Sequence, residues 1–234
     1  RNLKNLSSID NRLESLEGTL KNINNQIKQF RDSKISKDNK DEKRIYVPDE
    51  RFRTFLEDSG VGHEEGDYIV SDVTDKFKKF NLRKLNIQSL EGIEEFKNLL
   101  ELDCSGNELT SLDVSNSTDL TVLNCSNNQL KSLDISNNHD LTQLDCSENR
   151  RITRLDLSNN TALTELDCHI NEISIIDLES NENLDKLDCS YNELKEIDLC
   201  NNIALTELDC SSNQLEYLDI KYLENLTILC INSN

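Results

Sequence analysis

Two sets of residues in this sequence have types and spacings that could carry chemistry. Six cysteines follow one another at gaps of 21, 21, 22, 21 and 21 residues: Cys104, Cys125, Cys146, Cys168, Cys189 and Cys210. An aspartate stands directly before five of these six cysteines. Thiols can form disulfides or bind a metal, and rows of carboxylates can bind cations or a basic partner. Which of these chemistries is feasible depends on the secondary structure that positions the cysteines and the aspartates.

A fixed period of this length predicts a solenoid, in which every cysteine points into the core from one of a series of parallel strands. The torsion of roughly 90° across a disulfide does not suit such a regular stack. A thiol metal site would need close spacing such as CxxC, which the sequence lacks. We therefore expect small buried hydrophobic residues with inert thiols, no metal and no cofactor. Cys200 and Cys230 lie outside this ladder, and Cys230 should face solvent.

The repeat itself is the leucine-rich repeat pattern, with cysteine at the third apolar position. One copy reads LxxLxCxxNxLxxLDISN from Leu120. The alternation around Cys125 predicts a short strand with one buried face, and Asn128 can bond backbone groups where the chain turns. A second alternation at Leu133 and Ile135 predicts an extended rather than helical return segment. Arg151 is an extra residue that produces the gap of 22.

Residues 45–234 resemble internalin-type bacterial surface proteins, in the subclass with 21-residue repeats and a cysteine ladder, and also the LDCSxNxLxxLDLSNN repeats of Bacteroidetes. The resemblance implies an α/β, β-rich leucine-rich repeat solenoid with a parallel concave sheet and a small helical N-terminal cap. It also implies an adhesin-like protein that is secreted or on the cell surface, with a cytoplasmic location as the alternative. Asp49 is the expected N-cap of a helix through Phe52, Phe55 and Leu56.

A second period precedes the repeats, with apolar residues spaced alternately 3 and 4 apart. It predicts a coiled coil in which leucine at a and isoleucine at d favour a trimer or tetramer over a dimer. A helix that folds back on its own chain is the alternative. We divide the chain into a coiled-coil helix (1–31), a charged linker (32–44), a cap (45–80) and repeats (81–234), which we expect to continue because no polar cap closes them. The oligomerisation residues are Leu6, Ile9, Leu13, Leu16, Leu20, Ile23, Ile27 and Phe30.

The residues between the buried positions of each strand should point outward in three columns, including a column of serines from Ser105 to Ser211. The central column repeats an aspartate on most strands, so like charges stand on neighbouring strands. These carboxylates are either tolerated because Ser and Asn neighbours bond them, or they form an acidic groove for a basic segment or divalent cations. His169 is a candidate catalytic or metal residue, or simply drift within the serine column. The predicted partner-binding residues are Glu101, Asp103, Asp145, Glu165, Asp167, His169, Asp188, Glu207 and Asp209.

Two further groups of charged residues stand apart from these columns. A second aspartate series, expected to serve turns, comprises Asp113, Asp134, Asp156, Asp177, Asp198 and Asp219. Arg150, Arg151 and Arg154 form the one basic cluster of the repeats and mark a possible contact site beside the inserted residue.

The charge balance restricts the class of partner. The chain carries a net charge of −19, with 26 basic and 45 acidic residues. This balance argues against nucleic acid, and no apolar run predicts membrane insertion. No catalytic residues are recognisable, so we expect a non-enzymatic protein-recognition module whose partner has a basic segment. A structural spacer of a larger surface protein and an intracellular scaffold or effector are the alternatives.

Overall fold

The computed structural model describes residues 43–71 and 73–234, which belong to one compact unit from Lys43 to Asn234. The predicted coiled coil, its oligomerisation residues and most of the linker lie outside the described residues. Within the described part, no helix is long and apolar enough to span a membrane.

The described part begins with a small α/β cap. Strands β1 (Lys43–Tyr46), β3 (Tyr68–Ser71) and β2 (His63–Glu65) form an antiparallel sheet in the order β1-β3-β2, and helix α2 spans Glu50–Asp58. The predicted N-cap is confirmed, because one carboxylate oxygen of Asp49 accepts hydrogen bonds from the N–H groups of Arg51 and Phe52. Its other oxygen accepts from Gln88 and Ser89, so Asp49 also ties the cap to the first turn of the solenoid.

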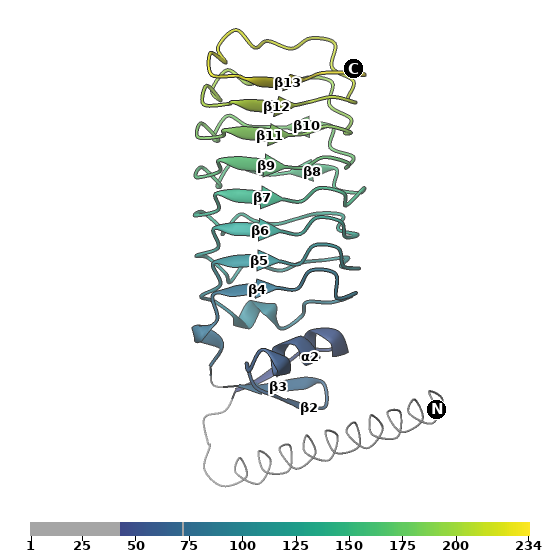
Figure 1. Cartoon of the computed structure of the whole chain (residues 1–234), viewed down its shortest axis with the longest axis vertical. Coiled ribbons are helices and arrows are strands. Elements are labelled where there is room, and N and C mark those ends of the chain that lie inside the picture. The colour runs from purple at the N-terminus through teal and green to yellow at the C-terminus, as the bar shows by residue number, and fades with distance from the viewer. Residues whose placement is uncertain (1–42, 72) are drawn as a thin grey trace, which may run out of the picture. The chain divides into compact units, whose positions relative to one another are not determined.

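The solenoid is built on one parallel sheet of eight strands, stacked in chain order (Figure 1). Each strand is three residues long, and the register repeats without a slip: Leu102 pairs with Leu123, and Leu123 with Leu144. The strands are β4 (Lys79–Asn81), β5 (Glu101–Asp103), β6 (Val122–Asn124), β7 (Gln143–Asp145), β9 (Glu165–Asp167), β11 (Lys186–Asp188), β12 (Glu207–Asp209) and β13 (Ile228–Cys230).

The return segments are extended, as predicted. Strands β8 (Arg154–Leu155) and β10 (Ile175–Ile176) pair in parallel, and Asp113 forms an isolated parallel bridge with Asp134. Short 3₁₀ turns at η1 (Thr74–Lys76) and η2 (Ile93–Glu95) are the helical elements described after α2. Each turn of the solenoid therefore has a sheet side and an extended back side.

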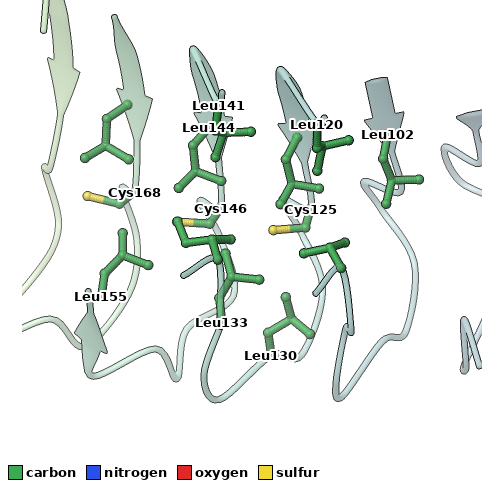
Figure 2. Packing of buried hydrophobic residues seen from close by; sticks show 14 of the residues in the cluster. Leu102, Leu120, Cys125, Leu130, Leu133, Leu141, Leu144, Cys146, Leu155 and Cys168 are labelled. Atoms are coloured by element: carbon green, nitrogen blue, oxygen red, sulfur yellow. The ribbon is translucent and has the colours of Figure 1, made fainter. Parts of the chain in front are cut away.

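Leucines and cysteines fill the space between these two sides (Figure 2). The six ladder cysteines are fully buried and free, which confirms the prediction of inert core thiols. Burial raises the pKa of the Cys104 thiol far above its ordinary value, and that of Cys210 to about 11. These groups therefore stay protonated and pack as small apolar side chains.

A ladder of buried asparagines satisfies the backbone where each turn leaves the sheet. The amide of Asn128 donates to the carbonyl of Cys104 in the preceding turn (3.0 Å) and to the carbonyl of Cys125 in its own turn (3.1 Å). Its oxygen accepts from the N–H of Leu109 at 3.0 Å. One side chain thus pairs three buried backbone groups, each of which would be costly to leave unpaired. The predicted backbone role of Asn128 is confirmed.

The extra residue at Arg151 disturbs this ladder at one place. In the turns that lead to Asn128, Asn149, Asn192 and Asn213, the asparagine oxygen accepts a backbone N–H at 2.9–3.0 Å. The buried oxygen of Asn171 has no such donor among the described residues. Arg150 also has a positive φ of 62°, which adds a second left-handed residue to a turn that already has one at Glu148. The insertion therefore costs a hydrogen bond and local strain.

Candidate functional site

The outward side chains of the eight-stranded sheet form a continuous surface, which we call the sheet face. The register places Asp145 of β7 beside Asp167 of β9, and Asp167 beside Asp188 of β11. A parallel column on the same strands holds Glu165 between Gln143 and Lys186. The predicted partner-binding residues lie on strands of the sheet or, for His169, two residues after one. All nine are half-exposed: Glu101, Asp103, Asp145, Glu165, Asp167, His169, Asp188, Glu207 and Asp209.

Four turns hold their sheet-face carboxylate with the serine two residues later. Asp103 accepts hydrogen bonds from the backbone N–H of Ser105 at 3.0 Å and from its hydroxyl at 2.6 Å. The same pair of bonds recurs at Asp145, Asp188 and Asp209. Two donors on one oxygen stabilise the charge, so that like carboxylates are accommodated on neighbouring strands.

These bonds correct one prediction. The serines were expected to form a third exposed column, but Ser105, Ser147 and Ser190 are buried, with exposed fractions of 5%, 3% and 4%. The chain turns at this position, and the hydroxyl is directed back onto the carboxylate instead of toward solvent. Ser126 and Ser211 stay half-exposed, so the third column is only partly open to solvent, and its serines support the neighbouring aspartates.

The sheet face is hollowed, and its charges are partly compensated. A cavity of about 520 Å³ extends from β6 to β13 and is lined by the two outward columns with the leucines beneath them. Lys79 forms an ion pair with Glu101, and Lys186 lies 3.2 Å from Glu207. The central column has no such basic partner except the imidazole of His169, among the residues described. The face thus offers an open, acidic hollow.

His169 takes the place of the usual serine and keeps its hydrogen bond. Its Nδ1 lies 2.6 Å from the Asp167 carboxylate, which also accepts the His169 N–H at 3.1 Å. Burial raises the pKa of Asp167. Burial lowers the pKa of His169, but the hydrogen bond to Asp167 and the nearby charges of Asp167, Asp188 and Glu148 outweigh it and raise that pKa. The neighbouring strand's Asp188 was missed as a partner of His169, although the 21-residue register places it there.

The second aspartate series, which we call the back-face aspartates, serves turns as predicted. Asp113 accepts from the N–H and hydroxyl of Ser115 at 3.0 and 2.6 Å, and Asp134 accepts in the same way from Ser136. These side-chain and backbone hydrogen bonds lower the pKa of Asp113 and Asp134. The series comprises Asp113, Asp134, Asp156, Asp177, Asp198 and Asp219.

The three arginines near the insertion are all exposed. Arg150 and Arg151 lie in the turn, whereas Arg154 begins β8 on the back side. There the hydrogen bonds from Ser158 lower the pKa of Asp156, and the charge of Arg154 adds to this effect. Their predicted role as a contact site stays a prediction.

Comparison with known proteins shows which solved structures the fold is similar to. No protein-family model and no curated protein matches the chain. Among solved structures, the functional domain of InlJ from Listeria monocytogenes, which includes a cysteine ladder, is 30% identical with a TM-score of 0.57. The match covers 80% of this chain and 52% of that one, so the chain spans about half the length of this neighbour.

Two further solved structures are similar. The leucine-rich repeat domain of APL1B is 28% identical (TM-score 0.59; 65% of this chain and 47% of that one). A leucine-rich repeat protein of Leptospira interrogans is 24% identical (TM-score 0.59; 63% and 40%) and shows the fold alone. The parallel sheet and the buried cysteine ladder agree with these similarities. The chain is a leucine-rich repeat solenoid with a cysteine ladder, and it is similar to internalin-type proteins.

Proposed function

We propose that this chain is a non-catalytic protein-recognition module that binds a partner with a basic segment on its sheet face. Leucine-rich repeat domains generally bind proteins, and repeat solenoids use their extended surfaces for this purpose. The observation that carries the proposal is the register of acidic side chains over the hollow of the sheet face, exemplified by Asp145, Asp167 and Asp188 on three adjacent strands.

The charge of the solenoid supports a basic partner. Residues 81–234 contain 29 acidic and 10 basic residues. An acidic surface of this extent raises the rate of encounter with a positively charged segment and disfavours acidic partners. The half-exposed carboxylates keep enough contact with solvent to avoid a large desolvation cost before binding.

The heptad pattern of residues 6–30 supports display on an oligomeric stalk, as a trimer or tetramer. Several copies on one stalk would bind an array of partners with an avidity gain of about 10²–10⁴. This arrangement suits an adhesin-like protein that is secreted or on the cell surface. Sedimentation equilibrium of the full chain tests the stalk: a monomer, or an unchanged mass after Leu13→Lys and Leu20→Lys, contradicts it.

The recognition proposal is tested by affinity capture with two matched variants. The first carries Glu101→Lys, Glu165→Lys and Glu207→Lys, in a column where Lys186 already occurs. The second has the same change in charge at exposed glutamates elsewhere on the solenoid, by substitution of lysine at Glu172, Glu193 and Glu216. The aspartates that support the turns stay intact in both, and circular dichroism checks the fold.

We expect a partner from host-cell or extracellular-matrix extracts to be retained by the unmodified chain and the second variant, and lost by the first. Equal retention by all three chains contradicts recognition by the sheet face. The absence of any partner favours the structural spacer, a function that the asparagine ladder also suits because its amides bond each turn to the preceding one.

A further inference from the structure

One turn of the sheet face differs chemically from the others because histidine replaces serine. Asp167, His169 and Asp188 each place a metal-ligand atom within 4.8 Å of the other two. Among the described residues, this is the one group of three or more His, Cys, Asp or Glu side chains with such close ligand atoms. Five other turns have a serine hydroxyl here, at Ser105, Ser126, Ser147, Ser190 and Ser211, and thus lack a third ligand of this kind.

The backbone brings the three side chains together. Asp167 and Asp188 are register partners on adjacent strands, β9 and β11, so their carboxylates leave the sheet side by side. His169 follows Asp167 by two residues, and its hydrogen bond to Asp167 directs the imidazole back over the sheet face. All three side chains are half-exposed and therefore reachable from solvent.

The charges around the cluster favour a cation. Asp167 and Asp188 have no ion pair with lysine or arginine in the part of the chain that the structure describes. The hydrogen bonds that these two carboxylates accept there all go to Oδ1: from His169 on Asp167, and from Ser190 on Asp188. The Oδ2 atom of each aspartate is thus the natural ligand atom.

We propose that Asp167, His169 and Asp188 form a binding site for a divalent transition metal ion, with Zn²⁺ as the best fit. Zn²⁺ accepts imidazole nitrogen and carboxylate oxygen at about 2.0–2.2 Å, which places tetrahedral ligand atoms about 3.4 Å apart. The three ligand atoms must close by up to about 1.4 Å, which rotation of half-exposed side chains allows. An imidazole in the donor set favours Zn²⁺ or Ni²⁺ over Ca²⁺ and Mg²⁺, which take oxygen ligands.

This site lies on the sheet face, on three of the residues predicted to bind a partner, but it does not depend on that recognition; it revises the expectation that the chain binds no metal. Three protein ligands leave one coordination position open, as in zinc sites that also bind water or a ligand. The simpler interpretation is that His169 only replaces serine as the hydrogen-bond donor to Asp167. The two interpretations differ in whether His169 and Asp188 act together on an added ion.

The test is calorimetric titration of the full chain with zinc chloride in 0.15 M NaCl. It is performed on the unmodified chain and in a Cys200→Ser, Cys230→Asn background, which removes the two thiols outside the buried ladder. His169→Ser restores the residue of the other turns. Asp188→Asn removes one ligand, and Asp103→Asn is the matched control in the same column, where Asn124 shows that asparagine is accepted.

We expect one Zn²⁺ per chain in the background lacking Cys200 and Cys230, with an affinity at least tenfold lower in His169→Ser and Asp188→Asn and unchanged in Asp103→Asn. Circular dichroism confirms that each variant is folded. Saturable binding that His169→Ser leaves unchanged overturns the proposal, as does the absence of saturable binding up to 1 mM zinc.

Discussion

Deletion of Arg151 should make the protein more stable, although most deletions inside a folded domain do the opposite. The deletion reduces the gap between Cys146 and Cys168 from 22 to the 21 residues of the other turns. The N–H of Ile152 then takes the place that Ile173 has relative to Asn192, where the hydrogen bond is 2.9 Å long. The buried oxygen of Asn171 gains the donor that it lacks.

The magnitude follows from two costs of the insertion. A buried acceptor without a partner costs about 1–3 kcal/mol. A non-glycine residue with positive φ, here Arg150 at 62°, costs roughly 1–2 kcal/mol. The hydrogen bond from the Arg150 N–H to the Ile170 carbonyl, 3.2 Å long, is lost in exchange, at about 1 kcal/mol. We therefore expect the free energy of unfolding to rise by about 2 kcal/mol.

Urea unfolding followed by circular dichroism measures this change, with the m-value as the check that the transition itself is unaltered. The reciprocal control inserts an arginine after Gln129, which should break the hydrogen bond from Leu130 to Asn149 and destabilise the chain by a similar amount. A deletion variant that is no more stable than the parent chain would refute this account of the ladder.

Three further outcomes follow from the described contacts. Asn128→Ala should lower the free energy of unfolding by about 3 kcal/mol, because three buried backbone groups lose their partner, whereas the exposed Asn137→Ala should change it by less than about 1 kcal/mol; urea unfolding compares them. Native chains should react with a thiol reagent only at Cys200 and Cys230, and denatured chains at all eight cysteines, as counted by mass spectrometry. The pKa of five back-face aspartates (Asp113, Asp134, Asp156, Asp198 and Asp219) is lowered by hydrogen bonds from the residue two positions later. Their contribution to stability is therefore present above their ordinary pKa of 3.8 and lost as the pH falls through the lowered values. The urea concentration at the unfolding midpoint should therefore decrease as the pH is lowered below about 4. Asparagine at these positions should weaken that dependence, and an unchanged pH profile would contradict it.

The sequence was sufficient for those parts of the fold that depend on periodicity. The 21-residue spacing determined the buried position of Cys125, the register that aligns Leu102, Leu123 and Leu144, and the backbone role of Asn128. Each follows from the geometry of a stacked repeat, in which every turn faces the same constraints. The capping role of Asp49 was predictable because it depends on four consecutive residues.

Features that depend on side-chain direction or on single turns were not predictable in this way. The burial of Ser105 arises from a hydroxyl that turns back to its aspartate, which alternation along a strand does not reveal. The unpaired oxygen of Asn171 requires the path of the chain around Arg151. The proximity of Asp188 to His169 depends both on the strand register and on the side-chain conformation of His169. The antiparallel sheet of the cap contains no sequence repeat from which it could be predicted.

The central claim is that the sheet face recognises a basic partner. The most direct measurement is the dissociation constant of a purified captured partner for three chains: the unmodified chain, the sheet-face triple variant at Glu101, Glu165 and Glu207, and the matched triple variant elsewhere on the solenoid. At about 0.5 kcal/mol or more for each reversed charge, the sheet-face variant should bind at least about tenfold more weakly. The matched variant should bind as the unmodified chain does. Equal dissociation constants for the two triple variants would contradict the claim.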